Sequence, residues 1–340
     1  MIMHACTNDA GFHSRRSGPF MRVKSLFVYS AVIAAFCAGI VTKQRYHRWQ
    51  QQQRKRLSSE SHMLETTRGI IEYQMEGTGR VVLIFHGSPG GYDQGLAMAR
   101  FLGLSDFAIL TLSRPGYRRT SLSSGKTPES QADLFAATLN ALNVSQVLVI
   151  AHSGGGPAAL QFALRYPQRC RGLLLLSALS QNYTEEGIYR SLPLLRSLLK
   201  RLIDHLLFCE PLLYPLSILS KCLPEEMHAR EFIESLVQNP LSSMGYINDM
   251  TQFEELGVYP LQDIEHPTLI VHGTADVDIP FGQAQELANT IPLAQLVAIE
   301  GAHHLSMLTS ERAITAIRCF LEKLLHGTES RTEEGSLAED

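Results

Sequence analysis

A serine lies between a histidine and three glycines near the centre of the chain, in the hexapeptide AHSGGG over 151–156. A short apolar run precedes this hexapeptide and a helix-forming segment follows it. At such a strand-to-helix junction, a serine projects its hydroxyl only if the turn is very tight, which requires small residues two positions before and two after it. Ala151 and Gly155 meet that requirement. The pattern therefore predicts Ser153 as a nucleophile, with the Gly154 N–H beside it to stabilise negative charge.

A glycine-rich junction of this kind could instead hold a phosphate. The hexapeptide lacks the lysine of a P-loop, and it falls well inside the chain rather than in a first βαβ unit. Ala151 adds one methyl group where a glycine is often found, and we expect the turn to tolerate it. A nucleophilic serine is the better interpretation.

A serine hydroxyl needs a general base, and that base is usually oriented by a carboxylate. Two later segments end in such groups. The first, 269–276, reads as a buried strand, a glycine turn and Asp276; the second, 298–304, is a strand followed by His303 and His304. The acid therefore follows the serine in the chain, and the histidine follows the acid.

The loop HGSPGG over 86–91 follows another apolar run, 81–85. With the serine turn and the two later segments, it makes four motifs in an order that resembles the α/β-hydrolase superfamily. The resemblance covers roughly residues 68–325. It implies an α/β fold with a mostly parallel eight-stranded sheet flanked by helices and an inserted helical cap.

The resemblance also assigns roles to individual residues. It implies that Ser153 is the nucleophile, Asp276 the acid and His304 the base. Two backbone amides, of Ser88 and Gly154, would form the oxyanion hole. The supporting residues of the two turns are His86, Gly87 and Gly155.

Each of the last two triad members has a rival. His303 occupies the second glycine of the family's G-x-G-H loop, which favours His304 as the base. Asp278 lies two residues past Asp276, but the G-x-x-D spacing of the strand end favours Asp276. A triad of this type requires neither a metal nor an organic cofactor, and the six cysteines show no metal-binding spacing.

Alternating apolar runs and helical stretches support the same fold, because a parallel sheet covered on both faces has this pattern. The hydrolase core is expected over 65–180 and 263–326. From 181 to 262 no strand pattern is found, and leucines recur at helical spacing, which predicts a helical cap over the carboxyl edge of the sheet. The apolar faces of the cap either pack internally, line an acyl pocket or touch a membrane surface.

Leu26 to Val41 is uncharged and flanked by basic residues, so we expect a transmembrane anchor or signal over 25–42 after a basic segment, 1–24. A cleaved signal peptide and a buried helix are the alternatives. The flanking charges mildly favour a single-pass protein with a cytoplasmic body; export after cleavage would reverse this. A polar stalk is predicted over 43–64 and a disordered acidic tail over 327–340.

The charge distribution argues against nucleic-acid binding. Residues 1–56 hold ten of the thirty Lys and Arg but only Asp9 among the acids. The rest therefore carries twenty basic against thirty-two acidic side chains, a net charge of −12, which repels a phosphate backbone. The expected partners are a small-molecule ester or lipid-like substrate and, through residues 26–41, a membrane. The oligomeric state is not predicted.

The leucines of the cap favour an ester with an apolar acyl group as substrate. The HGSPGG loop is also similar to that of proline iminopeptidases, but those enzymes usually carry a tryptophan where Gly154 stands. An aminopeptidase would need an amine-binding group, for which the cap carboxylates are candidates. Carbon–carbon bond hydrolysis and a binding protein without turnover are further alternatives. The cap carboxylates in question are Glu225, Glu226, Glu231 and Glu234.

Overall fold

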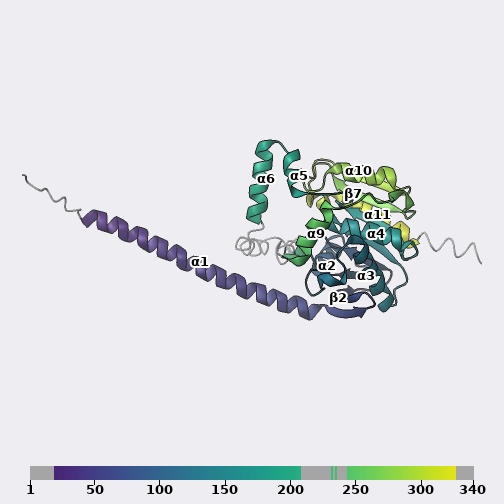
Figure 1. The fold of residues 1–340 in the computed structure, drawn as a ribbon, viewed down its shortest axis with the longest axis horizontal. Helices are drawn as coiled ribbons and strands as arrows, with labels where there is room; N and C mark the ends of the chain where they lie inside the picture. Colours follow the sequence, from purple (N-terminus) through teal and green to yellow (C-terminus); the bar gives the residue numbers. More distant parts are fainter. Residues whose placement is uncertain (1–18, 208–230, 233, 236–242, 327–340) are drawn as a thin grey trace, which may run out of the picture. The chain divides into compact units, whose positions relative to one another are not determined.

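The computed structural model describes residues 19–207, 231–232, 234–235 and 243–326 (Figure 1). The chain divides into two units, residues 1–51 and 52–340. The predicted acidic tail, residues 1–18 of the predicted basic segment and residues 208–230, 233 and 236–242 of the predicted cap lie outside the described residues.

The amino-terminal helix α1 runs from Pro19 to Glu60. The apolar stretch over 26–41 and most of the segment predicted as a stalk belong to this one helix, and strand β1 already begins at His62. Among the described helices, none combines the length and apolar character that crossing a bilayer demands. The transmembrane anchor expected over 25–42 is thus not supported. The eighteen uncharged residues between Lys24 and Lys43 lie at the lower edge of the ~17–25 that a spanning helix needs.

Eight strands form one sheet in the order β1-β2-β4-β3-β5-β6-β7-β8. β1 and β2 form an antiparallel hairpin, β2 pairs antiparallel with β4, and all later neighbours are parallel. The predicted α/β-hydrolase fold is confirmed. The strands are β1 His62–Thr66, β2 Gly69–Glu76, β3 Val81–Phe85, β4 Ala108–Leu112, β5 Val147–His152, β6 Cys170–Leu176, β7 Thr268–Gly273 and β8 Ala294–Ile299.

The central strands are mostly apolar because helices cover both faces of the sheet. Alternate residues of β5 point to opposite faces: Val149 packs in one core with α3 and α4, whereas Ile150 packs in the other with α2 and α11. α10 joins the first core through Leu287. These helices are α2 Tyr92–Phe101, α3 Pro128–Ala141, α4 Gly156–Arg165, α10 Phe281–Thr290 and α11 Glu311–His326.

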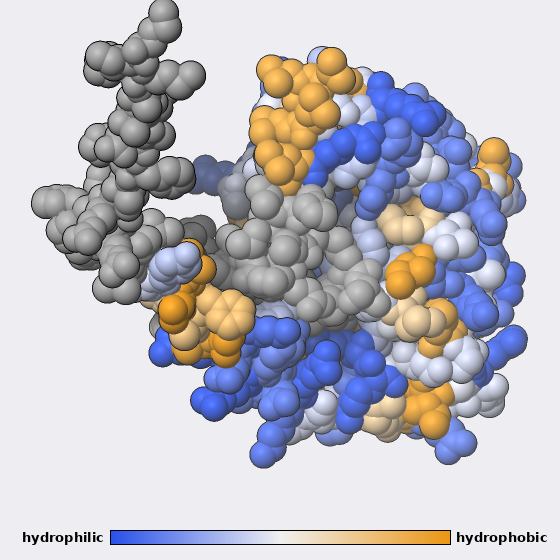
Figure 2. Space-filling view, turned by 60° about the vertical axis from the view of Figure 1, so that its left-hand side comes forward, coloured by the Kyte–Doolittle hydropathy of each residue, from blue (hydrophilic) through white to orange (hydrophobic). Residues whose placement is uncertain are grey.

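Between β6 and β7 the chain leaves the sheet. The described residues of this interval form helices α5 (Glu185–Ser191), α6 (Leu194–Leu207) and α9 (Met244–Glu254), with no strand among them. Five leucines of α6 are more than half exposed. Figure 2 shows several separate apolar (orange) areas among the hydrophilic (blue) surface, one of them at the top of the view. The exposed leucines are Leu194, Leu195, Leu198, Leu199 and Leu202.

Helix α9 brings the chain from the cap back to the core. The Gly245 N–H donates a hydrogen bond of 2.9 Å to the Gly116 carbonyl, in the loop after β4. The backbones lie so close that a Cβ on Gly116 would come within 2.6 Å of the Gly245 Cα. This contact fixes α9 against the loop that follows β4.

Candidate active site

The serine turn has the tight geometry that the sequence predicts. β5 ends at His152, and a short 3-10 helix over Ser153–Gly155 leads into α4. Ser153 has a φ of +49°, a strained conformation for a residue with a side chain. A Cβ on Gly155 would collide with the Phe85 carbonyl oxygen of β3, so only glycine fits there. Ala151 is fully buried within β5, and its methyl group is accommodated.

Three side chains from the carboxyl ends of three strands meet at this turn. His304, in the loop after β8, places Nε2 2.9 Å from Ser153 Oγ and Nδ1 2.8 Å from Asp276 Oδ2. Asp276 lies in the loop after β7. With the proton on Nδ1, His304 donates to the carboxylate and accepts from the serine hydroxyl. The sequence therefore identified a set of residues that the fold does bring together.

Asp276 is held as a carboxylate. Its Oδ1 accepts hydrogen bonds from the backbone N–H groups of Asp278 at 2.8 Å and Ile279 at 3.0 Å. Burial opposes its ionisation, but hydrogen bonds from His272 and His304 hold the pKa of Asp276 well below its ordinary value. His272 Nε2 lies 3.2 Å from Asp276 Oδ2. The acid therefore has a second histidine neighbour that the sequence patterns did not reveal.

The base is tuned in the opposite direction. Burial alone would lower the pKa of His304, but the hydrogen bond to Asp276 and the charge of that carboxylate raise the pKa above its ordinary value. A protonated His304 is thus stabilised beside an ionised Asp276. This is the charge state that forms when the histidine accepts a proton from Ser153.

Neither rival residue occupies a triad position. His303 is exposed, and its backbone N–H donates to Ser306 Oγ at 2.8 Å. The Asp278 carboxylate turns toward the cap, where Lys200 Nζ of α6 lies 2.7 Å away. Among the described residues, one group of potential metal ligands is found, Asp276, Asp278 and His304, and both ring nitrogens of its histidine already have partners.

The oxyanion loop follows β3 and faces the serine turn. A Cβ on Gly154 would collide with Ser88 Oγ, so the two proposed donor residues lie side by side. Gly154 is also in the first turn of a helix, where backbone N–H groups have no intrahelical acceptor. Gly87 is held by its N–H, which donates to Gln94 Oε1 at 2.7 Å.

His86 supports this loop as a neutral ring. Its Nδ1 lies 2.8 Å from the Gly87 carbonyl oxygen, and its Nε2 accepts from the backbone N–H of Arg114 at 2.9 Å. Burial and the Arg114 charge hold the pKa of His86 well below its ordinary value. A ring with one donor and one acceptor nitrogen satisfies both contacts only when it is neutral.

His152 lies against the catalytic histidine. The two ring centroids are 5.4 Å apart, and Phe232 of the cap packs edge-on to His152 at 5.8 Å. Burial and the neighbouring His304 lower the pKa of His152 to about 3. This ring is therefore a neutral wall of the site rather than a second base.

Sequence reasoning missed a buried cluster beneath the oxyanion loop. Arg114 and Asp249 form an ion pair with both side chains almost fully buried, and Ser88 and Tyr117 hydrogen-bond to the same carboxylate. Arg114 lies in the loop after β4, Ser113 to Tyr117, which differs from the corresponding loop of proline iminopeptidases but carries no motif that assigns Arg114 a role. Asp249 lies in the middle of α9, with no motif around it. No local signal could have found that residue.

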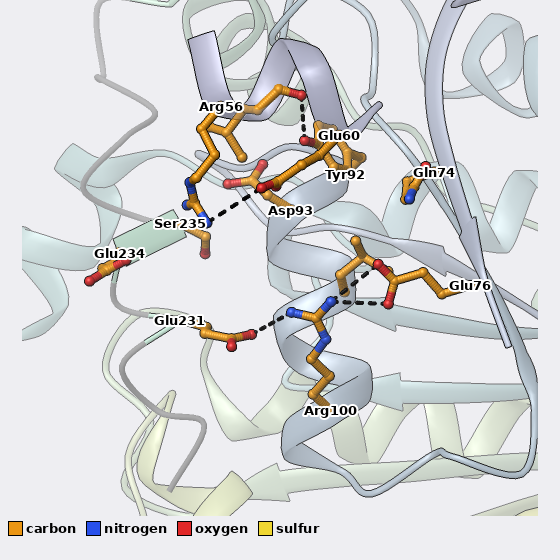
Figure 3. A pocket seen from close by; sticks show the side chains of 12 residues that line it. Arg56, Glu60, Gln74, Glu76, Tyr92, Asp93, Arg100, Glu231, Glu234 and Ser235 are labelled. Carbon is orange, nitrogen blue, oxygen red and sulfur yellow. Dashed lines mark hydrogen bonds and ion pairs between the residues drawn. The ribbon is translucent and has the colours of Figure 1, made fainter. Parts of the chain in front are cut away.

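A separate pocket of about 250 Å³ lies beside the start of α2 (Figure 3). None of the three triad residues lines it. Arg100 lies between the carboxylates of Glu76 and Glu231, and Arg100 Nη1 donates to Glu231 at 2.8 Å. Glu231 was a candidate amine-binding group, and its carboxylate is instead paired with an arginine at this pocket. Glu225 and Glu226 lie outside the described residues.

Comparisons with known proteins agree with the fold and the site. An uncharacterized hydrolase of Bacillus subtilis is 26% identical over 265 residues, which cover 73% of this chain and 92% of that protein. A 2-hydroxy-6-oxononadienedioate/2-hydroxy-6-oxononatrienedioate hydrolase of Burkholderia vietnamiensis is 26% identical over 248 residues, covering 66% and 81%.

Solved structures give the same result. An α/β hydrolase fold protein from Nakamurella multipartita has a TM-score of 0.62 and 30% identity, covering 78% of this chain and 98% of its own. A thermophilic esterase from Thermogutta terrifontis has a TM-score of 0.57 and 26% identity, with the same coverage. A family model for the α/β hydrolase fold matches residues 80–311, about two thirds of the chain. The chain therefore belongs to the α/β-hydrolase fold family and is a hydrolase.

Proposed function

We propose that this hydrolase cleaves a carboxylic ester with an apolar acyl group, through Ser153, His304 and Asp276 and a covalent acyl-enzyme. One observation carries the proposal: His304 lies within hydrogen-bond distance of both the serine hydroxyl and the carboxylate, with one ring nitrogen for each. This is the geometry required for a general base that is itself oriented.

In the first half of the reaction, Ser153 Oγ attacks the ester carbonyl carbon while its proton passes to His304 Nε2. The N–H groups of Ser88 and Gly154 receive the negative charge that develops on the carbonyl oxygen. When this intermediate collapses, the carbon–oxygen bond to the alcohol breaks, and His304 returns the proton to the leaving oxygen. The products are a free alcohol and an acyl group on Ser153.

In the second half, a water molecule repeats the attack. His304 takes one proton from the water as its oxygen bonds to the acyl carbon, and the same two amides again stabilise the oxyanion. Collapse breaks the bond to Ser153 Oγ, which recovers its proton from His304. Asp276 stays ionised throughout and stabilises the imidazolium without accepting the proton.

Apolar side chains next to the serine turn support an apolar acyl group. Phe253 of α9 is 4% exposed, and its ring would lie 3.0 Å from a Cβ on Gly154. Phe232 packs on His152 from the cap. Both residues belong to the interval between β6 and β7, and both bring carbon atoms rather than polar groups to the catalytic serine.

Carbon–carbon bond hydrolysis is the second candidate. It is favoured by one specific observation, the similarity over two thirds of the chain to a 2-hydroxy-6-oxononadienedioate/2-hydroxy-6-oxononatrienedioate hydrolase. The same three residues would serve that reaction. The aminopeptidase alternative loses support because Glu231 is paired with Arg100.

The test begins with a fluorophosphonate probe, which labels an activated serine. We expect wild-type protein to be labelled at Ser153, and the Ser153→Ala and His304→Ala variants to remain unlabelled. Ser123→Ala, at an exposed serine outside the site, is the matched control and should label normally. A wild-type protein that stays unlabelled, under conditions that label a known esterase, would leave a binding protein without turnover as the function.

The substrate class is tested separately. p-Nitrophenyl esters of increasing acyl length are compared with prolyl-p-nitroanilide and with a 2-hydroxy-6-oxo dienoate, using kcat/KM. We expect kcat/KM to be highest on an ester and to rise with acyl length beyond acetate. Faster turnover of the anilide or of the dienoate would refute the ester assignment and leave the triad in place.

A further inference from the structure

A buried ion pair lies directly beneath the oxyanion loop. Arg114 Nη2 is 2.5 Å from Asp249 Oδ2, and Arg114 Nη1 is 2.9 Å from Asp249 Oδ1. The two side chains are 1% and 2% exposed. This is a two-pronged pair between residues 135 positions apart, one from the loop after β4 and one from α9, which follows the cap.

The Ser88 hydroxyl hydrogen-bonds to both members of this ion pair. Arg114 Nη2 donates to Ser88 Oγ at 2.7 Å, and Ser88 Oγ in turn donates to Asp249 Oδ2. Because a guanidinium can only donate, the hydroxyl hydrogen must point to the carboxylate. Tyr117 adds a further donor to the same carboxylate oxygen at 2.7 Å. The Ser88 side chain is thus fixed in one orientation, with its hydrogen already used.

The same arginine also holds the backbone of the oxyanion loop. Arg114 Nε donates to the His86 carbonyl at 3.1 Å and Arg114 Nη2 to the Gly87 carbonyl at 3.3 Å. Three consecutive residues, 86 to 88, therefore hydrogen-bond to the one guanidinium. Ser88 is the last of them; its side chain lies against Gly154, the other residue proposed to supply an oxyanion N–H.

Stability alone does not account for this arrangement. Two buried charges lose their hydration, and a well-packed apolar pair of similar volume is often as stable or more so. A directed hydrogen-bond network offers something that an apolar pair cannot, which is a fixed direction for a neighbouring polar group. Here that neighbouring group is the Ser88 hydroxyl, next to Gly154.

We propose that Asp249 is a positioning residue of the oxyanion hole: with Arg114 it fixes the Ser88 side chain, and so aims the Ser88 N–H at the substrate oxygen. The Ser88 hydroxyl is a tether and not itself an oxyanion donor, since Asp249 takes its hydrogen. The helix that returns from the cap thereby completes the catalytic site. The inference rests on the serine-hydrolase function proposed above.

The experiment is a double-mutant cycle on the full chain with Asp249→Asn, Ser88→Ala and the double variant, assayed on p-nitrophenyl butyrate. Each single variant should lower kcat by ~10–100-fold, less than the ~100–1,000-fold that loss of a whole oxyanion donor costs, with KM changed less than about threefold. The double variant should be no slower than the slower single variant, because both break the same tether. Effects that multiply would overturn the proposal.

A boronic acid, which forms a tetrahedral adduct with an activated serine, provides a second readout. Its inhibition constant should rise in each variant by about the same factor as kcat/KM falls, because the adduct uses the oxyanion hole. If these residues only kept the fold intact, a substitution would either weaken the binding of both substrate and adduct, so that KM and the inhibition constant rise together, or leave both quantities unchanged. An inhibition constant that stays at the wild-type value while kcat falls would contradict the proposal.

Two controls separate this inference from folding and from the proposed function. Asp133→Asn removes a carboxylate that also binds an arginine and a tyrosine, Arg165 and Tyr166, but at the opposite end of α4 from the serine turn; kcat should not change. Ser88→Ala leaves the Arg114–Asp249 pair in place, so it tests the tether even if Asp249→Asn fails to fold. An unchanged kcat in Ser88→Ala would overturn the proposal. If wild-type protein neither labels nor turns over ester, the serine-hydrolase function itself fails and this inference falls with it.

Discussion

Two buried aspartates lie near the oxyanion loop and the serine turn, and they differ in what balances their charge. Asp249 faces a guanidinium that stays protonated, whereas Asp276 faces His304, whose charge changes during the reaction. The charge of Asp249 is therefore already neutralised in the resting protein. That of Asp276 is available to stabilise a proton when one arrives. The first carboxylate can only position its neighbours, and the second can take part in chemistry.

The largest expected difference is in kcat. Asp276→Asn should lower kcat by ~10⁴-fold, because an amide no longer holds His304 in the productive tautomer. Asp249→Asn should cost only ~10–100-fold, since the chemistry retains its base and nucleophile. Steady-state kinetics on one ester measures both. Equal losses in the two variants would remove the distinction between them.

The next largest effect is on stability, where the buried charge of Asp249 depends on its partner Arg114. Arg114→Met leaves Asp249 buried without its counter-ion, which costs about 3–5 kcal/mol in the free energy of unfolding. Arg114→Met with Asp249→Leu should recover much of that loss, because neither charge remains. Urea unfolding measures both variants. Arg165→Met is the control, because its partner Asp133 lies nearer the surface, and it should cost below about 1 kcal/mol.

The pH dependence of kcat/KM should distinguish the two carboxylates, because only Asp276 contacts the base. His304 acts as a base only when neutral, and Asp276 raises its pKa, so kcat/KM should rise with pH through a midpoint above the ordinary histidine value of 6.5. Asp276→Asn should move this midpoint to lower pH. Asp249→Asn should leave it in place; a shift there would show that Asp249 acts on the base.

The smallest expected effect concerns His303, the residue immediately before the base His304. His303→Ala should change kcat/KM by less than about twofold, because His303 is exposed and its hydrogen bonds to Ser306 and Met307 are made by its backbone N–H and carbonyl, which alanine keeps. His304→Ala is the matched variant. A large loss at His303 would place the base on the wrong residue and break the pairing with Asp276.

The sequence was sufficient for the parts of the site that local geometry determines. A serine after β5 needs small neighbours, and an acid and a histidine after two later strands arrive at the same edge of a parallel sheet, so their spacing is visible in the chain. The strands themselves are apolar runs that both faces of the sheet bury. These features are read from stretches of fewer than ten residues.

The remaining parts depend on contacts between distant residues. Asp249 is an ordinary polar residue on an amphipathic stretch until the fold places it on Arg114. Likewise, residues 43–60 are polar and were predicted to be part of a stalk, yet they continue helix α1. The apolar stretch over 26–41 was interpreted as an anchor, although its length lies at the lower limit for one. Composition alone does not decide such borderline cases.

The contact between Gly245 and Gly116 has a practical consequence for protein engineering. Helix α9 is joined to the loop after β4 at backbone level, and it carries the carboxylate that neutralises Arg114. Replacing the whole interval between β6 and β7 with that of another hydrolase would remove both. Chimeras made to alter substrate preference should therefore end the grafted segment before Met244, so that α9 stays with the parent scaffold.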